Sequence, residues 1–254
     1  MIMQNRPARF VIMCQPRTGS YLLVDLLNQF SDIVCHGEIF KPPRLEMLQW
    51  AKKRIPFTAE ERDKYPITFV RSVLDLTPNR VAGFKMFATH NAFARQFILE
   101  DPGIRKVILS RSPLESYISY KRANLTGEWV GRKRNSLVAE AKGAGPKVRF
   151  ERAEFMHHVK RAETLHSEYA EIEAFTKQEF LRISYDDVVK IEPVRRLAGV
   201  LGSKDLSASL APTLRKQIVE PLEDIVENHE EMVKCLGGDY KSTLVRASEN
   251  ISGG

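Results

Sequence analysis

Cysteine is scarce in this sequence, and its few residues are far apart. The chain has 254 residues and three cysteines, Cys14, Cys35 and Cys235. They form no Cys-x-x-Cys pair and no spacing typical of zinc ligands, so the cysteines predict no zinc site. Cys14 and Cys35 lie in apolar runs, where we expect buried thiols in a protein of a reducing compartment.

Long apolar runs are also missing. No stretch of about eighteen apolar residues occurs, so no membrane span is predicted. The segment Met1 to Arg9 has no long apolar core and does not resemble a signal peptide, and we therefore expect a cytoplasmic protein. A content of 43% hydrophobic and 28% charged residues is typical of a soluble globular protein.

Acidic residues are outnumbered by basic ones. The formal net charge is +7 and the pI is about 9.3. Such a balance suits nucleic acid, an anionic membrane surface or a small polyanionic ligand. By itself the charge does not separate these three kinds of partner.

One segment near the N-terminus has the clearest local pattern. The apolar, β-branched run from Arg9 to Cys14 predicts a buried strand, and leucines at helical spacing predict a helix that begins near Ser20. The first amides of such a helix lack intrahelical acceptors and attract anions. In the intervening turn, Arg17 adds a guanidinium cation with several hydrogen-bond donors, and Gly19 lets the backbone come close to a bound anion. Thr18 and Ser20 add hydroxyls, so the turn predicts a phosphate or sulfate site.

A Walker A loop is absent from this turn. That motif needs a glycine, four residues and then Gly-Lys followed by Ser or Thr. Here no lysine follows Gly19, and Arg17 precedes it. The chain also lacks an obvious magnesium-binding carboxylate, so a triphosphatase or a kinase-like enzyme is disfavoured. Taken alone, the turn is also compatible with a plain strand-to-helix connection that carries a surface arginine.

Hydrophobic strands alternate with helices along the rest of the chain. This alternation predicts an α/β protein with a mostly parallel sheet of about five strands flanked by helices. Further strands are expected at 33–35, 81–87, 106–110 and 179–185. Helices are expected at 45–54, 60–76, 92–100, 113–123, 151–176, 193–201 and 221–236. Ser112 and Glu115 predict a capping box at the start of the helix at 113–123. The basic segment 124–150 is expected to be a mobile loop.

Polar residues follow the strands at the edge of the sheet where ligands bind. Beyond the first turn, these residues are His36, Glu38, Lys85, His90, Arg111 and Ser119. Arg111 and Ser119 could hold one anion while the first turn holds another. Two anion sites at neighbouring strand ends suggest a nucleotide with phosphates at both ends of its ribose.

The order of these motifs resembles that of the sulfotransferase superfamily. The main likeness is carried by Pro-Arg-Thr-Gly-Ser at 16–20 and Arg-Ser-Pro-Leu-Glu-Ser-Tyr-Ile-Ser at 111–119. Further motifs are similar to those of bacterial carbohydrate sulfotransferases of the trehalose and nodulation-factor type, at 37–38, 83–85, 123–129, 184–187 and 214–217. Each motif alone is weak, but their order and spacing over nearly the whole chain are fairly specific.

The resemblance implies a single three-layer, P-loop-like α/β domain over residues 1–254 and a donor site for 3′-phosphoadenylyl sulfate (PAPS). In that family the first loop binds the 5′-phosphosulfate, and the Arg and Ser of the later motif bind the 3′-phosphate. The residues then expected to bind the donor are Arg17, Thr18, Gly19, Ser20, Tyr21, Arg111, Ser119, Arg215 and Lys216. The product would be 3′-phosphoadenosine 5′-phosphate (PAP), and no metal is expected.

The family differs in its catalytic base, and this sequence offers both kinds. Many animal cytosolic members use a His after the third strand, and the trehalose-type enzymes use a Glu after the second. His90 and Glu38 are therefore the candidates, and the context favours Glu38, although a carboxylate there could simply cap the next helix. Arg17 cannot give up a proton and is expected to act as an electrostatic clamp. Lys85, inside an apolar strand, is expected to contact an anion or to belong to a structural ion pair.

The acceptor side is less specific. The resemblance implies a carbohydrate or glycolipid acceptor and a bacterial protein, without naming the sugar. His36 is either structural or a substrate contact, and Trp129 either stacks on a sugar ring or anchors its loop. Arg122 either contacts substrate or belongs to a solvated basic surface.

A protein that binds nucleic acid or a phosphate ligand with the same basic surface is the alternative function. The segment 124–150 has only Trp129 and Phe150 as large aromatics and so lacks the regular interleaving of a stacking platform. No nucleic-acid partner is therefore expected. A homodimer could form through residues 45–80 or through the C-terminal amphipathic helix.

Overall fold

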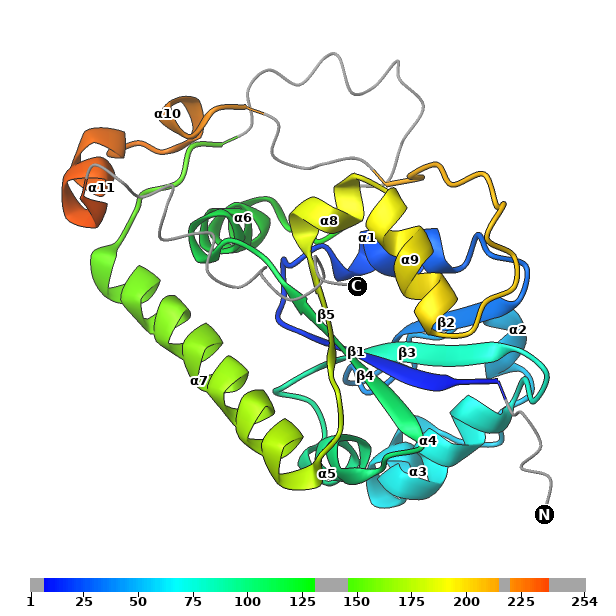
Figure 1. Ribbon diagram of the computed structural model, residues 1–254. Helices are drawn as coiled ribbons and strands as arrows, with labels where there is room; N and C mark the ends of the chain where they lie inside the picture. Colours follow the sequence, from blue (N-terminus) through cyan, green and yellow to red (C-terminus); the bar gives the residue numbers. More distant parts are fainter. Residues whose placement is uncertain (1–6, 131–145, 215–219, 238–254) are drawn as a thin grey trace.

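The chain is organised around one sheet of five parallel strands (Figure 1). The computed structural model describes residues 7–130, 146–214 and 220–237. The strands are β1 (Arg9–Cys14), β2 (Ile33–Glu38), β3 (Val81–Phe87), β4 (Ile104–Ser110) and β5 (Leu181–Ser184). They lie in the order β2-β3-β1-β4-β5, and every neighbouring pair is parallel. This arrangement confirms the predicted α/β fold.

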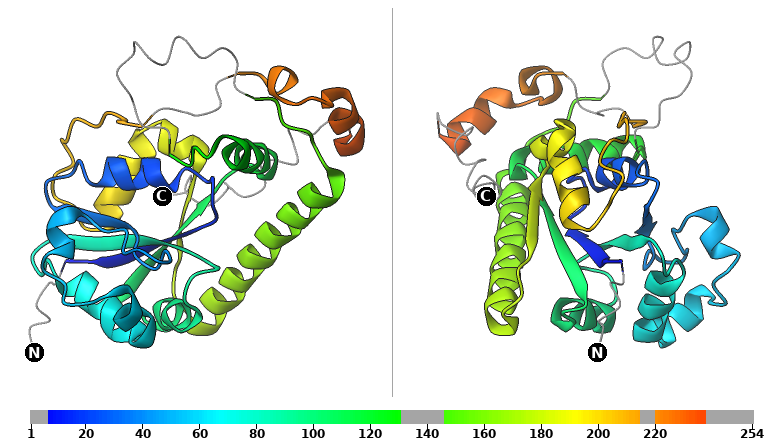
Figure 2. Two further views of the ribbon diagram at one scale, coloured as in Figure 1. Left: turned by 180° about the vertical axis from the view of Figure 1, so that it is seen from behind. Right: turned by 45° about the vertical axis from the view of Figure 1, so that its right-hand side comes forward.

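Helices cover both faces of the sheet, which makes three layers (Figure 2). One face is covered by α1 (Ser20–Leu27), α8 (Tyr185–Val189) and α9 (Glu192–Val200). The other is covered by α4 (Pro66–Asp75), α5 (Ala92–Glu100) and α7 (Arg152–Thr176), with α2 (Gln49–Lys52) and α3 (Ala59–Lys64) beside them. A third cluster joins α6 (Pro113–Thr126) and the start of α7 to α10 (Leu222–Ile225) and α11 (His229–Leu236). Every helix in the described ranges is too short or too polar to cross a membrane.

The sequence of β1 explains why helices are needed on both sides. Val11 and Met13 belong to the core under α4, α5 and α7, whereas Phe10 and Ile12 belong to the core under α1 and α9. Successive side chains of a strand point to opposite faces, so a strand that is apolar at every position must be buried on both. All four of these side chains are fully buried.

The position of β1 in the sheet also places the site. β3 lies on one side of β1 and β4 on the other, so the connections after β1 and β3 run in opposite directions across the sheet. Open parallel sheets bind ligands in the crevice where the connections diverge in this way. The carboxyl end of β1, with the turn at 15–19, is therefore the expected binding edge.

Several element ends differ from the prediction. β2 continues to Glu38 because a bulge between His36 and Glu38 keeps the strand paired with β3. β5 is shorter than predicted because Ser184 caps α8. The predicted helix at 221–236 is divided into α10 and α11, since Val226 between them forms a bridge to Val148.

The start and the end of α6 also differ from the prediction. Ser112 Oγ accepts the predicted hydrogen bond from Glu115 N at 3.3 Å, but the Glu115 carboxylate does not complete a capping box. It pairs with Arg111 instead, at 3.1 Å. The helix runs to Thr126, inside the segment predicted to be a loop. Most of that segment, residues 131–145, lies outside the described residues.

Candidate active site

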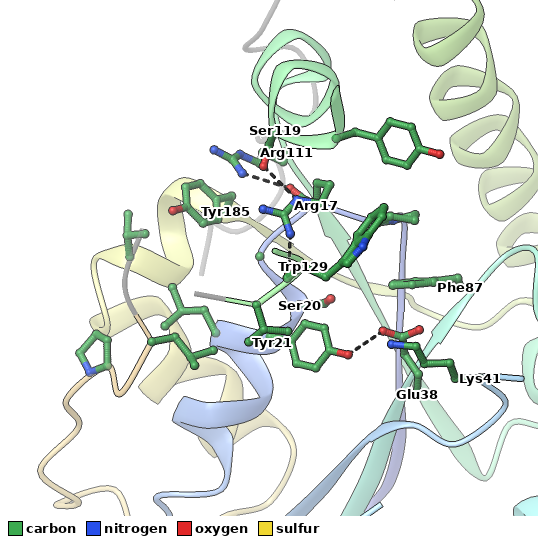
Figure 3. A pocket seen from close by; sticks show the side chains of 18 residues that line it. Arg17, Ser20, Tyr21, Glu38, Lys41, Phe87, Arg111, Ser119, Trp129 and Tyr185 are labelled. Atoms are coloured by element: carbon green, nitrogen blue, oxygen red, sulfur yellow. Dashed lines mark hydrogen bonds between the residues drawn. The ribbon is translucent and has the colours of Figure 1, made fainter. Parts of the chain in front are cut away.

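The strand ends meet at a cavity of about 630 Å³ (Figure 3). Its walls come from the β1–α1 turn, the ends of β2 and β3, α6, α8 and the segments after α6 and before residue 215. The lining residues are Pro16, Arg17, Gly19, Ser20, Tyr21, Leu22, Glu38, Lys41, Phe87, Arg111, Ser119, Tyr120, Trp129, Val130, Tyr185, Val189, Pro212 and Leu214. The structure thus brings together most of the side chains that the sequence predicted at the donor site.

The β1–α1 turn owes its shape to two residues with left-handed backbone. Arg17 has a φ of 69° and Gly19 a φ of 87°. A Cβ on Gly19 would lie 2.4 Å from Tyr185 Cδ2, so only glycine fits this position. Thr18 closes the turn by donating from Oγ1 to the Gln15 carbonyl at 2.8 Å. No side chain caps α1, so the amides of its first turn can serve an anion.

Arg17, within this turn, and Arg111, just after β4, lie next to each other. Arg17 Nε donates to Ser119 Oγ at 2.9 Å, and Arg111 Nη1 donates to the Arg17 carbonyl at 3.1 Å (Figure 3). The Arg111 guanidinium also lies 4.1 Å from the centre of the Tyr185 ring. Burial, together with the charge of Arg111, lowers the pKa of Arg17 to about 10, so both side chains are cations at neutral pH. The motifs at 16–20 and 111–119 therefore form one cationic site.

Glu38 and Lys85 form a buried ion pair beside the turn. Lys85 Nζ lies 3.0 Å from Glu38 Oε1 and donates to Ser20 Oγ at 3.3 Å. The side chains of Lys85 and Glu38 are 0% and 5% exposed. Burial lowers the pKa of Lys85, and the charge of Glu38 opposes that shift. The pair fits the structural alternative for Lys85, which also reaches Ser20 in the first turn of α1; its contact with an anion stays a prediction.

A second carboxylate lies close to Glu38. Tyr21 OH lies 3.1 Å from Glu38 Oε1 and 2.7 Å from Glu46 Oε1. Lys41 Nζ is 3.6 Å from the other oxygen of Glu46. The hydroxyl of Tyr21 therefore connects a buried carboxylate to a half-buried one.

His90 approaches Glu38 from the other side. Its Nδ1 accepts a hydrogen bond from Phe87 N at 3.2 Å, and its Nε2 lies 3.7 Å from Glu38 Oε2. Burial lowers the pKa of His90, although the charge of Glu38 opposes the shift. The neutral imidazole therefore carries its proton on Nε2, facing Glu38.

The structure does not bring every predicted residue to the cavity. His36 is 2% exposed and its Nδ1 accepts from Leu48 N at 3.4 Å, so its position fits the structural alternative and not a substrate contact. Arg122 instead pairs with Glu220 at 3.0 Å. Trp129 does line the cavity and is 43% exposed. Arg215 and Lys216 lie outside the described residues.

Several residues that line the cavity or contact its carboxylates were not predicted from the sequence, among them Lys41, Glu46, Phe87 and Tyr185. Tyr185 could have been predicted, because it belongs to the motif at 184–187. Glu46 gave no such signal, since it follows two prolines in a segment with little periodicity. In residues 7–130, 146–214 and 220–237, no three His, Cys, Asp or Glu side chains are grouped to hold a metal ion.

Comparison with known proteins gives two kinds of similarity. No family model matches the sequence. Nodulation protein H of Rhizobium meliloti (strain 1021) is 26% identical over 252 residues, which cover 92% of this chain and 94% of the relative. Nodulation protein H of Rhizobium tropici is 26% identical over 246 residues, 92% of each chain. Among solved structures, a sulfotransferase from Alicyclobacillus acidocaldarius is 16% identical, covers 89% of this chain and 90% of that chain, and has a TM-score of 0.45.

The similarity to the two Nodulation protein H sequences spans almost the full length of this chain. The motifs at 16–20, 37–38 and 111–119 lie far apart in the sequence. In the structure all three motifs contribute side chains to one cavity at the carboxyl ends of parallel strands. The chain is therefore similar over nearly its full length to Nodulation protein H, and the motifs that carry its resemblance to the sulfotransferases converge on one cavity.

Proposed function

We propose that this protein transfers a sulfuryl group from PAPS to a hydroxyl of a carbohydrate or glycolipid acceptor, with Glu38 as general base. The observation that carries the proposal is that one cavity is lined by two cationic side chains and a buried carboxylate. It holds an anion-binding turn with Arg17, a second cation in Arg111 beside Ser119, and the buried carboxylate of Glu38. Two cationic subsites and a base are what a nucleotide donor with two anionic ends and a hydroxyl acceptor require.

The donor would be held by both subsites. The turn at 16–20 and the first amides of α1 suit the 5′-phosphosulfate, because backbone N–H groups and Arg17 supply donors and positive charge. Arg111 and Ser119 suit the 3′-phosphate. The hydrogen bond from Arg17 to Ser119 couples the two subsites, so each would orient the other.

The proposed reaction is an in-line transfer. The acceptor oxygen forms a bond to sulfur as the bond from sulfur to the 5′-phosphate oxygen breaks, and PAP leaves. The proton of the acceptor hydroxyl goes to Glu38. Negative charge then grows on the leaving phosphate beside Arg17 and Ser20. Protonation of Glu38 also removes the partner of Lys85, whose charge is left next to Ser20 to stabilise the leaving group.

The geometry supports Glu38 over His90 as the base. Glu38 lines the cavity, and His90 does not. Both ring nitrogens of His90 are engaged, because Nδ1 accepts from Phe87 N and Nε2 carries the proton. A base needs a free lone pair toward the acceptor, which only Glu38 offers here.

Isothermal titration with PAP tests the donor site directly. We expect the wild type to bind PAP, and Arg111→Ala to bind it about 10- to 100-fold more weakly, the equivalent of one lost charged hydrogen-bonding contact. AMP, which lacks the 3′-phosphate, should bind equally to the wild type and to this variant. Arg71→Ala, which removes an exposed arginine on α4, is the matched control.

Glu38→Gln completes the experiment. This variant should still bind PAP but fail to turn over PAPS with a panel of sugar acceptors. Folded wild-type protein that does not bind PAP would overturn the proposed function. Retained turnover by Glu38→Gln would overturn only the choice of base.

A further inference from the structure

We propose that Tyr21 and Glu46 form a proton relay that carries the proton taken up by Glu38 to solvent. The relay rests on the proposed function, since it begins at the base of that reaction. It adds Glu46, a residue of the segment after β2, to the groups that serve turnover. Tyr21, so far a residue of the donor site, becomes the link between two carboxylates. Its contact with Glu38 is drawn in Figure 3.

The number of protons available makes this arrangement unusual. One tyrosine hydroxyl lies within hydrogen-bond distance of two carboxylates, Glu38 at 3.1 Å and Glu46 at 2.7 Å. A phenol has one proton and can donate it to one of them. It donates to the nearer group, Glu46, which leaves the oxygen of Tyr21 facing Glu38 as an acceptor. The second hydrogen bond is complete only when Glu38 is protonated, which is its state after the acceptor hydroxyl has been deprotonated.

The burial of the two carboxylates gives the relay a direction. The Glu38 side chain is 5% exposed, whereas that of Glu46 is 35% exposed. Lys41, 3.6 Å from Glu46, is 47% exposed. The chain from Glu38 through Tyr21 to Glu46 therefore leads from a buried carboxylate to a partly exposed side chain, of which Oε2 itself is buried without a hydrogen-bond partner among the described residues. Lys85 favours departure of the proton, because its charge stabilises the ionised form of Glu38.

Each transfer in the relay conserves protons. The O–H bond of Glu38 breaks as its proton bonds to the Tyr21 oxygen, and the original O–H bond of Tyr21 breaks as that proton bonds to Glu46. Glu46 then gives a proton to water. Tyr21 begins and ends neutral, in keeping with burial and the neighbouring carboxylates, which raise the pKa of Tyr21 far above its usual range.

The other neighbours of Glu38 do not offer the same exit. His90 already carries a proton on the nitrogen that faces Glu38, and Lys85 is a donor without a lone pair while charged. Among the described residues, Tyr21 is thus the group with both a free lone pair toward Glu38 and a proton to pass on.

The test measures conversion of PAPS to PAP with water as the acceptor, so that it needs no knowledge of the sugar. Tyr21→Phe and Glu46→Gln should each lower kcat about 10- to 100-fold, the lower part of the range for proton-transfer groups. Because both residues belong to one relay, the double variant should be no slower than either single variant. The solvent deuterium isotope effect on kcat should rise in Tyr21→Phe, because the slowed proton transfer then limits turnover, and a purely structural role would not produce this change. Tyr65→Phe and Glu60→Gln, both on the exposed surface near α3, are matched controls.

The outcomes separate the relay from the function on which it rests. Two results would overturn the relay and leave the sulfotransferase proposal intact, provided that Glu38→Gln strongly lowers turnover. One is that the losses in kcat of Tyr21→Phe and Glu46→Gln add up in the double variant. The other is an unchanged solvent isotope effect in Tyr21→Phe. No acceleration of PAPS loss by the wild type would count against both. Unchanged PAP affinity in Glu46→Gln, whose residue does not line the cavity, is the check that the donor site is preserved.

Discussion

Gly19 is a residue at which two separate constraints coincide. Its φ of 87° is unfavourable for any side chain, and a Cβ there would also strike the Tyr185 ring at 2.4 Å. We predict that Gly19→Ala lowers the free energy of unfolding by at least about 2 kcal/mol, since the backbone penalty and the overlap add. Urea denaturation measures the loss, and PAP binding should weaken because the turn must move.

Gly127 provides the matched control for this substitution. Its φ of 69° is similar, but a Cβ there would meet no atom within 4 Å. Gly127→Ala should cost only the backbone penalty, about 1 kcal/mol, and should leave PAP binding unchanged. Equal losses in the two variants would show that the contact with Tyr185 adds nothing.

His36 makes stability depend on pH. Burial lowers its pKa from 6.5 to about 4, so the folded protein holds the imidazole neutral where the unfolded chain would protonate it. Its contribution is therefore fully present above pH 6.5 and is lost as the pH falls from 6.5 to about 4. The loss from this one group amounts to about 3 kcal/mol.

Denaturation at several pH values checks the size of this contribution. His36→Asn should flatten the fall in stability between pH 6.5 and 4. His157→Asn, which removes an exposed histidine of α7, should show the same fall in the free energy of unfolding with pH as the wild type. The histidines His90, His158 and His166 also have lowered pKa values and contribute to the slope that remains.

Individual site residues could be predicted where their role is local. Arg17 and Gly19 lie in a turn whose chemistry follows from the strand before it and the helix after it. Glu46 could not be predicted, because its role comes from a contact with Tyr21, 25 positions earlier in the chain. The neutral state of His36 likewise depends on burial beside Trp50, which no local pattern reveals.

The element that most directly supports Glu38 is α3. From α3, Arg62 reaches back to the segment after β2, where its Nη1 lies 3.2, 3.3 and 3.0 Å from the carbonyls of Ile39, Lys41 and Arg44. Arg62 is 1% exposed. It therefore holds the chain that follows Glu38 in place through three backbone carbonyls, of which that of Ile39 is buried.

Replacing Arg62 should affect stability and turnover together. Arg62→Met keeps an apolar stem but leaves the carbonyls unpaired, so we expect a loss of about 3 kcal/mol in unfolding free energy. Turnover of PAPS should fall because Glu38 and Glu46 both flank the released segment. Lys64→Met changes an exposed cation on the same helix and should alter neither quantity. Full activity of a destabilised Arg62→Met would mean that Arg62 acts on folding alone.

At the level of elements, the predictions succeeded where one element carries its own pattern. β1 is apolar at nearly every position, and α5 and α7 have clear helical spacing, so all three were found near their observed bounds. The region 45–76 was less readable. It holds α2, α3 and α4, which are short, and prolines at 56 and 66 interrupt the spacing on which the prediction depends. The break between α10 and α11 depends on the contact of Val226 with Val148, which is invisible in the local sequence.

For the whole molecule, the sequence predicted a parallel sheet but could not give its strand order. Alternating strands and helices are compatible with several orders, and only the packing of the helices selects β2-β3-β1-β4-β5. That order decides the site, since it places Lys85 of β3 beside Glu38 of β2 and both next to the turn after β1. The Glu38–Lys85 pair is therefore a consequence of the topology, while its two members could be named from the sequence.

The net charge of +7 acts on the whole molecule, and its effect can be separated from that of the built site. PAP at about 100 times its dissociation constant should raise the free energy of unfolding by about 2.7 kcal/mol.

A random single-stranded oligonucleotide, attracted only by net charge, should lose its effect on Tm between about 50 and 200 mM salt. The PAP effect should persist there, because Arg17, Arg111 and the helix amides contact the ligand directly, whereas fields beyond about 8 Å are screened at physiological salt. Arg111→Ala should lose most of the PAP shift. An oligonucleotide that raises Tm as much as PAP at 200 mM salt would contradict this expectation and favour nucleic acid as the partner of the basic surface.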